Sequence, residues 1–462
     1  MGSDERSAGL ESGRLREELA AARALIVALQ EEVAGLKRQL AEATAAVEEA
    51  QRVAARQAAP FRRDETKKIP PGEQKRPGRK GGHRGQSRPL PDRVDDEIEE
   101  PLACCPQCGG EVSDRSPLVQ FIEELPPVRP RVTRLVTWQG TCARCGAVRS
   151  THPLQTSTAQ GAAAVQLGPR ALAVAALLNK HLGLTMRKTC RVLRKLLGLS
   201  LSPGGLSQAL DRMADKTEAD YDVLLATIRA SDAVFSDETS WWVGEPKWWL
   251  WVFTNSRATL YRVEKSRAGQ VARETLGDEF GGTLVSDCLN VYDGLSCRKH
   301  KCIAHHLRAI REARARPDTP DGDYLQQWKL VFKAVIALWK TRPAMPAEVF
   351  AAERARIETA VERLLNQPVV QPGDVAIQNR LLKQGPHLLG CLHEPAAEPT
   401  NNRAEQALRP AVIARKLSCG NRTERGRRTW EILASLAATC QQNADDFVDW
   451  LAAKLPLATQ VR

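Results

Sequence analysis

The sequence predicts a multidomain α/β fold, and three of its features lead to this prediction. A heptad repeat lies near the N-terminus, two Cys-x-x-Cys pairs follow it, and the second half alternates β-rich segments with long helical stretches. The chain of 462 residues is long enough for about three globular domains. We divide it into six successive segments: 10–58, 59–100, 101–155, 160–228, 229–430 and 431–462.

The composition excludes several classes of protein. The longest clean apolar run, residues 171–178, is much shorter than the roughly 20 residues that cross a bilayer. The N-terminal residues are polar and lack the apolar core of a secretion signal, so we expect a cytoplasmic protein that contacts no membrane. In that compartment its 12 cysteines should be reduced or metal-bound rather than disulfide-bonded. Lys and Arg number 67 against 55 Asp and Glu, and the resulting charge of +12 favours a polyanionic partner.

Residues 10–58 carry an unbroken heptad repeat, which predicts a coiled coil. β-Branched residues recur at position a and Leu at position d, a pattern that favours a parallel two-stranded coil. We therefore expect a homodimer or a higher oligomer assembled through this segment. A single amphipathic helix packed on its own chain is the alternative. The repeat places Leu19, Ile26, Val33, Leu40 and Val47 at a, and Leu15, Ala22, Leu29, Leu36 and Ala43 at d.

Residues 59–100 lose this periodicity and are rich in Pro, Gly and charge. The stretch 61–90 contains ten Lys or Arg against three acidic residues, and such a sequence cannot bury enough apolar surface to order itself. We expect a flexible basic arm that contacts phosphates, although a solvated linker has the same composition.

Residues 101–155 contain two Cys-x-x-Cys knuckles, each followed directly by a glycine that lets the chain turn. Four thiolates at this spacing are the typical ligand set of a closed structural Zn²⁺ site, so we expect a zinc ribbon whose strands are 118–125 and 131–138. Cys104 adjoins the first knuckle and is an alternative ligand, and two unrelated pairs of reduced cysteines would have the same sequence. The expected ligands are Cys105, Cys108, Cys142 and Cys145.

Residues 160–228 are expected to form helices separated by short breaks. Thr185 can cap one helix and Gly198 can end it, while Ser202 followed by Pro203 has the pattern of the next helix start. Two helices joined by a tight Gly-containing turn are typical of a DNA-binding helix-turn-helix, although an ordinary helical hairpin with a basic side has the same pattern. The side chains expected to contact DNA are Arg187, Lys188, Arg191, Ser207, Gln208 and Arg212.

Two aspartates are distinguished from the other acidic residues by what precedes them. Asp237 and Asp287 each follow a short apolar segment that ends in Ser, which predicts a carboxylate at the end of a buried strand. β-Rich runs separated by turn residues follow Asp237, as in an antiparallel meander. A ribonuclease-H-like domain begins in this way, and we expect that fold for residues 229–430. Five tryptophans are expected to pack in the sheet, with stacking on unpaired DNA bases as the alternative: Trp241, Trp242, Trp248, Trp249 and Trp251.

Glu405 is the third candidate acid, on a short helix that Asn401 or Asn402 begins and Pro410 ends or kinks. Two strand-borne Asp and one helix-borne Glu can hold two divalent cations about 3.5–4 Å apart, which activate the attacking water or 3′-hydroxyl and stabilise the leaving oxygen. Hard oxygen ligands suit Mg²⁺ or Mn²⁺. A solvated acid paired with a nearby arginine is the alternative. The residues expected to contact a phosphate backbone here are Asn402, Arg409, Arg415 and Lys416.

Four sequence blocks resemble the signature blocks of the insertion sequence 66 family of DDE transposases. They are SDET at 236–239, SDC at 286–288, CIAH at 302–305 and NNRAEQALRP at 401–410, and the similarity extends from about residue 10 to the C-terminus. The resemblance implies a ribonuclease-H-like catalytic core with Asp237, Asp287 and Glu405 as its triad. It also implies a helical insertion at about 308–390, in which 328–339 and 347–365 have helical patterns. Residues 431–462 are expected to form a C-terminal helical element.

The sequence departs from the family pattern at two places. Family members often have Asp-Gly-Tyr at the second acid, whereas Cys288 follows Asp287 here, which makes Asp293 a rival for that role. The family's CWAH is replaced by CIAH, in which His305 is expected to neighbour the site. A further set lacks paired knuckle spacing, so a reduced, partly buried cluster is favoured over a second zinc site: Cys297, His300, Cys302 and His306.

Together these features predict a nucleoid-associated DNA transposase that binds the terminal inverted repeats of its mobile element and cleaves and joins DNA strands. Its expected cofactors are two Mg²⁺ or Mn²⁺ ions per active site and a structural Zn²⁺, and its expected partners are the element ends and the target DNA. Two alternatives remain. One is a zinc-containing DNA-binding regulator derived from an inactive copy, and the other is a ribonuclease-H-like nuclease that cuts branched DNA without joining it.

Overall fold

The computed structural model describes residues 31–33, 35–36, 39–40, 88–157, 165–315 and 322–456. The chain divides into two compact units, Met1–Glu123 and Glu124–Arg462. In the first unit, the short described stretches of the heptad segment are helical, and Val33, Leu36 and Leu40 are exposed. The rest of the expected coiled coil and residues 59–87 of the expected basic arm lie outside the described residues. Residues 88–123 are irregular backbone and turns.

The second unit begins with a small hairpin of two strands, β1 (Gln139–Cys142) and β2 (Gly146–Arg149), which pair antiparallel. The prediction of strands at 118–125 and 131–138 is wrong, because both segments are irregular and mostly exposed. Prolines 126, 127 and 130 lie between them and have no N–H to donate to a partner strand. The observed hairpin instead closes around the second knuckle, where Gly146 has a φ of +72°.

Helices follow the hairpin, and their ends agree with the predicted capping residues. The Thr185 side chain accepts a hydrogen bond from Lys188 N–H, Gly198 ends its helix with a φ of 66°, and Ser202 Oγ accepts one from Gly205 N–H at 3.1 Å. The first helix runs directly into a π-helical turn. The elements are α2 (Pro169–Ala176), η2 (Leu177–His181), α3 (Met186–Leu197), α4 (Pro203–Lys216) and α5 (Glu218–Arg229).

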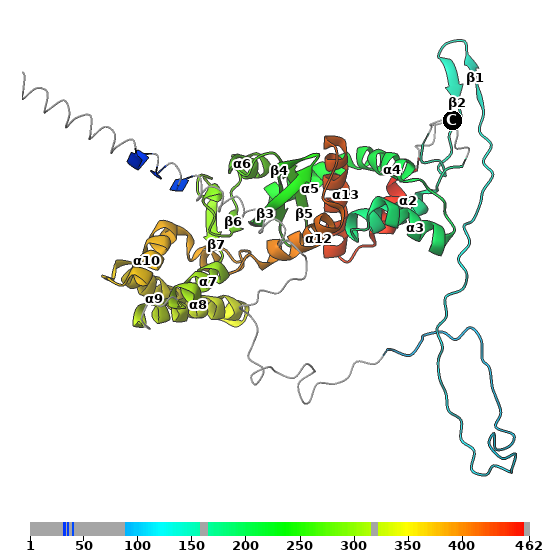
Figure 1. Cartoon of the computed structure of the whole chain (residues 1–462), viewed down its shortest axis with the longest axis horizontal. Coiled ribbons are helices and arrows are strands. Elements are labelled where there is room, and N and C mark those ends of the chain that lie inside the picture. The colour runs from blue at the N-terminus through cyan, green and yellow to red at the C-terminus, as the bar shows by residue number, and fades with distance from the viewer. Residues whose placement is uncertain are drawn as a thin grey trace, which may run out of the picture. The chain divides into compact units, whose positions relative to one another are not determined.

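A five-stranded mixed sheet forms the centre of the second unit (Figure 1), with the strand order β5-β4-β3-β6-β7. β3, β4 and β5 are antiparallel neighbours, whereas β6 and β7 run parallel to β3. The expected meander is therefore confirmed, and a parallel pair extends it. The strands are β3 (Ala233–Val243), β4 (Glu245–Thr254), β5 (Thr259–Glu264), β6 (Thr283–Ser286) and β7 (Arg298–Lys301).

The end of β3 differs from the prediction. Asp237 lies in the middle of this 11-residue strand rather than at its end. The strand continues because Trp241 pairs with Trp248 of β4, and both indoles are buried. Trp251 is also fully buried, which confirms the packing role for these three, whereas Trp242 is 41% exposed.

The two faces of the sheet pack against different helices. Alternate residues of β3, beginning with Ala233 and Phe235, belong to one apolar core together with α12 and α8. The intervening residue Val234 belongs to a second core with α4, α5 and α6. This alternation follows from the period of two along a strand.

The remaining helices of the second unit surround the sheet (Figure 1). The stretches 328–339 and 347–365, predicted to be helical, lie inside α8 and α9. The bounds are α6 (Gln270–Leu276), η3 (Asn290–Tyr292), α7 (Ile303–Arg314), α8 (Asp323–Thr341), η4 (Arg342–Ala344), α9 (Ala347–Asn366), α10 (Pro372–Gln384), η5 (Gly385–His387), α11 (Gly390–His393), α12 (Asn402–Ser418), α13 (Glu424–Gln442) and α14 (Phe447–Lys454).

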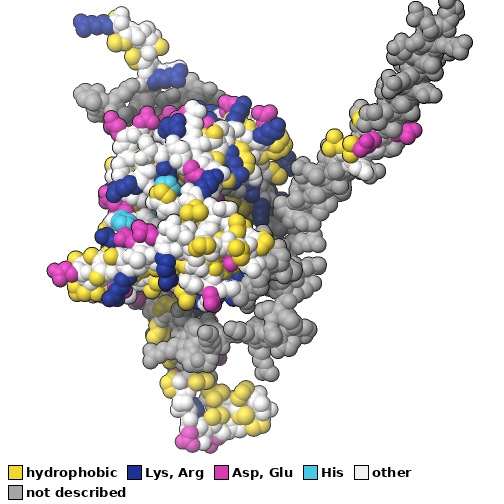
Figure 2. Space-filling view, turned by 90° about the vertical axis from the view of Figure 1, so that its left-hand side faces the viewer, with side chains coloured by type: hydrophobic (Ala, Val, Ile, Leu, Met, Phe, Trp, Pro, Cys, Tyr) yellow, Lys and Arg dark blue, Asp and Glu magenta, His cyan; other side chains and the backbone are white. Residues whose placement is uncertain are grey.

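The surface over the helices at the α9–α10 end mixes positive and negative side chains without a field of one sign (Figure 2). Among the described helices, none has a stretch long and apolar enough to cross a membrane.

Candidate active site

Asp237 and Asp287 lie at the same level on two neighbouring parallel strands. Phe235 of β3 is in register with Val285 of β6, and each aspartate follows its strand partner by two residues. Since side chains two residues apart share a face, this register directs both carboxylates to the same side of the sheet. Asp287 directly follows β6, as predicted, and its Oδ1 accepts a hydrogen bond from Leu289 N–H at 2.9 Å.

The helix α12 brings the third acid to this side of the sheet. Ala404 and Leu408 of α12 are buried in the same core as Phe235. Glu405 therefore stands in the first turn of a helix that packs on β3, and it is half-buried. Pro410 lies inside α12, so the prediction that it could end the helix is wrong, because the helix runs on to Ser418.

Asn401 fixes the start of α12. It occupies the N-cap position, but its side chain makes no capping hydrogen bond. Instead its Nδ2 donates to the Ser236 carbonyl at 2.8 Å, and its backbone N–H donates to Cys302 Sγ at 3.1 Å. Asn401 is fully buried, so it connects β3, the residue after β7 and α12.

The environment of Asp237 disfavours its ionised form. Burial raises the pKa of its carboxyl from 3.8 to about 7, and the charges of Glu238, Asp287 and Glu405 add to the effect. A hydrogen bond from Glu238 N–H to Asp237 Oδ1 at 2.9 Å acts in the opposite direction. In the described part of the chain, no Lys or Arg forms an ion pair with Asp237. Three candidate acids are thus close enough for their charges to interact.

A second set of groups meets at Glu405. One ligand atom each from Cys302, His305 and Glu405 lies within 4.8 Å of the others. Cys302 follows β7, and its N–H donates to the Ser286 carbonyl at 2.9 Å, so it sits beside the strand end that carries Asp287. The structure therefore places His305 next to the acids, where it was expected to be.

The donor atoms at this place fit a divalent cation. Among the described residues, the buried Nδ1 atom of His305 has no hydrogen-bond partner. The charged groups that act on Asp237 are carboxylates, which a cation would balance. The Cys302 thiol is a weaker candidate, because burial raises its pKa and favours the protonated form. Carboxylate oxygens suit Mg²⁺ or Mn²⁺, whereas an imidazole suits Zn²⁺ and other transition-metal ions, so the group combines donors of both preferences.

The opposite face of β3 carries a compensated acid, which sequence reasoning missed. Glu238 follows Asp237 directly, and its side chain is 1% exposed. Arg267 pairs with Glu238 Oε1 at 2.9 Å, and the Tyr292 hydroxyl donates to Oε2 at 2.6 Å. The Tyr292 hydroxyl also lies 3.3 Å from Ser236 Oγ. Both acids belong to the Ser-Asp-Glu-Thr block, and they point to opposite faces of the sheet because successive side chains alternate along a strand.

Asp293, the rival for the second acid, lies in an ion pair. Its carboxylate is 3.0 Å from the ammonium of Lys301, a fully buried residue. Lys301 Nζ also donates to the Leu289 carbonyl at 3.2 Å, so it supports the loop that follows Asp287. Lys301 was missed as well, although it directly precedes the CIAH block.

The cysteines and histidines near CIAH do not form a second zinc set. His306 lies 3.5 Å from Cys288 Sγ and stacks on Phe332, and burial lowers its pKa to about 3. His300 Nε2 contacts the Pro399 carbonyl at 3.1 Å, and burial lowers its pKa to about 4. Among the described residues, the one group of His, Cys, Asp or Glu side chains whose ligand atoms all lie within 4.8 Å of one another is Cys302, His305 and Glu405.

The two Cys-x-x-Cys knuckles lie in different units, Cys105 and Cys108 in the first and Cys142 and Cys145 in the second. Within each knuckle, the backbone N–H groups and the second cysteine lower the pKa of the first thiol, which favours the thiolate that binds zinc. The first turn begins at Cys105, whose N–H donates to the Gly110 carbonyl at 2.8 Å, while Cys104 is exposed outside it.

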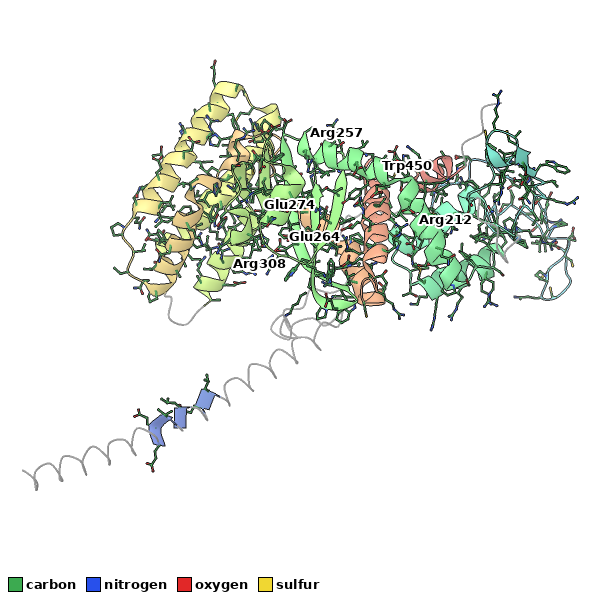
Figure 3. The ribbon with its side chains drawn as sticks, turned by 90° about the horizontal axis from the view of Figure 1, so that it is seen from above. Arg212, Arg257, Glu264, Glu274, Arg308 and Trp450 are labelled. Atoms are coloured by element: carbon green, nitrogen blue, oxygen red, sulfur yellow. The ribbon has the colours of Figure 1, made fainter. Side chains whose placement is uncertain are left out.

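Most of the side chains expected to contact DNA from α3 and α4 are exposed. Arg212 lies on α4, at the end of the second unit opposite Arg308 of α7 (Figure 3). Ser207 is half-buried. The exposed members of the set are Arg187, Lys188, Arg191, Gln208 and Arg212.

The expected phosphate contacts on α12 fall into two kinds. Asn402, Arg409 and Lys416 are exposed. Arg415 differs, because its guanidinium donates to Thr239 Oγ1 at 3.1 Å and to Ser240 Oγ at 2.8 Å. Arg415 therefore ties α12 to β3.

A sequence profile of the Transposase IS66 family matches residues 164–429, more than half of the chain. The chain therefore belongs to this transposase family. Two proteins of Sinorhizobium fredii are similar to it, both described as uncharacterized. One, y4qI, is 25% identical over 57% of this chain and 54% of its own length, so the alignment spans about half of that relative. The other, y4hP, is 24% identical over 79% of this chain and 72% of its own length.

Proposed function

We propose that the chain is a DNA transposase that binds the terminal inverted repeats of its mobile element and catalyses metal-dependent strand cleavage and strand transfer. Membership of a transposase family supports the general activity. The single observation that carries the choice of residues is that the β3–β6 register directs Asp237 and Asp287 to the face of the sheet on which α12, the helix of Glu405, packs. Three acids distant in sequence are thereby assigned to one catalytic site.

The arrangement of the central sheet supports a ribonuclease-H-like core. Three antiparallel strands, β5-β4-β3, continue into the parallel strands β6 and β7. Ligands of open α/β sheets bind beyond the carboxyl ends of parallel strands, and Asp287 and Cys302 follow β6 and β7 there. Helices α7 to α11 fall between β7 and α12, in agreement with the helical insertion of the proposed family fold.

In this proposal Asp237, Asp287 and Glu405 hold divalent cations, with His305 beside them. Bound Mg²⁺ or Mn²⁺ would polarise the phosphodiester and neutralise the charge that develops on its oxygens. The protein supplies position: Asn401 anchors α12 to β3, and Lys301 holds the loop after Asp287. Ion-paired Asp293 is not assigned to the triad.

DNA recognition is assigned to several modules. Helices α3 and α4 are joined through the αL residue Gly198 and carry exposed basic side chains, which supports their assignment as a helix-turn-helix. The four knuckle cysteines are proposed to hold a structural Zn²⁺, which their lowered pKa values at Cys105 and Cys142 favour. The exposed apolar seam at Val33, Leu36 and Leu40 supports self-association through the heptad segment.

A strand-transfer assay with the element's own ends tests the proposal. We expect 3′-end cleavage and joining to target DNA with Mg²⁺ or Mn²⁺, and neither reaction with EDTA. End binding without cleavage would instead indicate a regulator, and cleavage of branched DNA without joining would indicate a nuclease. Asp278→Asn, at an exposed aspartate that follows α6, is the matched control for Asp287→Asn, because only the latter removes a proposed ligand.

A further inference from the structure

A cavity of about 350 Å³ lies on the side of α12 away from the acids. It is lined by η2, the end of β4, the start of β5, α12 and α13, all in the second unit. Its apolar walls are made by small side chains of two facing helices, which leave space that larger residues would fill. These are Ala407, Ala411 and Ala414 of α12 and Ala434 and Ala438 of α13.

A lysine supplies the charge of this cavity. Lys180 lines it and is only 7% exposed. In the described parts of the chain, no hydrogen bond or ion pair engages its ammonium, and Asp211 acts on it only through its charge. Burial lowers the pKa of Lys180 to about 8, so most of the molecules still carry the ammonium at neutral pH. The residue sits in the π-helical turn η2, a rare conformation that is common at functional sites.

Arg403 and Gln442, two other polar residues of the wall, have partners. Arg403 pairs with Glu398 at 2.6 Å, and Gln442 joins Thr259 Oγ1 at 2.8 Å to the Asn255 carbonyl at 2.6 Å. Burial lowers the pKa of His181, so its imidazole is neutral at pH 7. A buried ammonium without a partner is therefore left to pair with an anion from outside.

The rest of the wall offers an aromatic surface and a backbone acceptor. The Trp430 ring lies 5.3 Å from the Tyr261 ring, and the Tyr261 hydroxyl donates to the Ala407 carbonyl at 2.6 Å, which fixes its position. Pro410 has no N–H to donate to the carbonyl of Gln406 in the preceding turn, and both residues line the cavity. An aromatic wall next to a backbone acceptor suits a flat group that carries N–H donors.

The cavity and the acids lie on opposite edges of one exposed helix face. At 100° per residue, the cavity-lining residues Ala407 and Ala414 lie on the other side of α12 from Glu405, with exposed Arg409 and Ile413 between the two edges. The diameter of a helix is about 10 Å, which a DNA strand covers in about three nucleotides. A strand held at the acids can therefore reach the cavity across α12.

We propose that this cavity binds one unpaired nucleotide, with its base against the Trp430–Tyr261 wall and its phosphate at Lys180. This proposal depends on the proposed function in one respect, because it assumes that the nucleotide belongs to the DNA substrate. A free nucleoside monophosphate has the same chemistry, and the cavity volume lies in the range of small-ligand sites.

Equilibrium binding of the full-length protein to labelled duplexes tests this assignment. The probes are one duplex with a single unpaired thymidine, the same duplex with an abasic site at that position, and its fully paired form. We expect the unpaired thymidine to improve the affinity about tenfold over the abasic site. Lys180→Met should reduce this preference to about twofold or less, and Ala438→Phe, which fills the cavity, should do the same. Lys333→Met, which removes an exposed lysine of α8, should leave it unchanged.

Equal affinity of the wild-type protein for the thymidine and abasic probes overturns the proposal, as does an unchanged preference in both cavity variants. Competition by thymidine monophosphate at the cavity, with no preference among the duplexes, identifies a free nucleotide as the ligand and overturns the DNA source. Strand-transfer activity without the thymidine preference rejects the cavity assignment alone. The preference without any strand transfer rejects the proposed catalysis and leaves the cavity site in place.

Discussion

Two neighbouring acids on opposite faces of strand β3 lie in opposite electrostatic environments. Glu238 faces one core, where Arg267 and the Tyr292 hydroxyl both contact its carboxylate. Asp237 faces the other side, where burial raises its pKa to about 7 and the charges of Glu238, Asp287 and Glu405 add to the effect. Both acids come from the same four-residue block, and both are largely withdrawn from water.

The difference separates a structural acid from a candidate catalytic one. A buried carboxylate whose charge is balanced by an arginine and a hydroxyl stabilises the fold and has little capacity for another ligand. A group of carboxylates whose charges repel one another is instead completed by a cation. A buried carboxylate without a balancing cation therefore marks the candidate site on β3.

The largest expected effect is on strand cleavage, and it tests whether Asp237 and Glu238 differ in role. Asp237→Asn, Asp287→Asn and Glu405→Gln should each lower strand cleavage at least about 1,000-fold while DNA binding persists, because each removes a proposed cation ligand. Glu238→Gln should lower it less than about tenfold under conditions where the protein is folded. Comparable losses in Asp237→Asn and Glu238→Gln would abolish the distinction. Single-turnover cleavage of labelled element ends measures the rate of each variant.

Folding stability should respond in the reverse order. Glu238→Gln should lower the free energy of unfolding by about 2 kcal/mol, because Arg267 and Tyr292 lose a charged partner. Asp237→Asn should not destabilise the metal-free protein at pH 8, because it removes a carboxylate that burial and its neighbours disfavour. Urea unfolding of both variants beside the wild type makes the comparison. Greater destabilisation by Asp237→Asn would contradict it.

The pH dependence of stability sharpens the same contrast. Because the pKa of folded Asp237 is raised from 3.8 to about 7, the folded state retains a proton that the unfolded chain releases. The metal-free protein should therefore lose about 3 kcal/mol of stability between pH 4 and pH 7 through this residue. Asp237→Asn should remove that part of the slope, and Mg²⁺ should restore stability at pH 8. An identical slope in wild type and variant would show that the carboxyl is not perturbed.

The smallest expected effect concerns two arginines of α12, one exposed and one hydrogen-bonded to β3. Exposed Arg409 is free to contact a phosphate, so Arg409→Ala should reduce the slope of log affinity against log salt by about 1. Arg415 is bonded to β3, so Arg415→Ala should lower stability and leave the salt slope unchanged. Anisotropy titrations at several salt concentrations distinguish the two. A lower slope in Arg415→Ala would return that residue to the DNA contacts.

The sequence predicted the local elements most successfully where side chains act on adjacent backbone. Thr185, Gly198 and Ser202 were assigned to helix ends from their chemistry alone, and each has that role. The strands expected at 118–125 and 131–138 failed because pairing depends on a partner strand, which local pattern does not supply. The break expected after Asp237 failed for the same reason, since the Trp241–Trp248 pair continues β3.

The signature blocks of the sequence determined the family of this chain, and its capping residues determined several helix ends, because these properties are local and do not depend on coordinates. The tertiary structure decided which charges are balanced. It set Glu238 against Arg267, paired Lys301 with Asp293, and gathered Asp237 with Asp287 and Glu405. The physical reason is that Coulomb interaction and desolvation depend on distance and burial in space, and residues 118 positions apart in the chain, such as 287 and 405, acquire both only through folding.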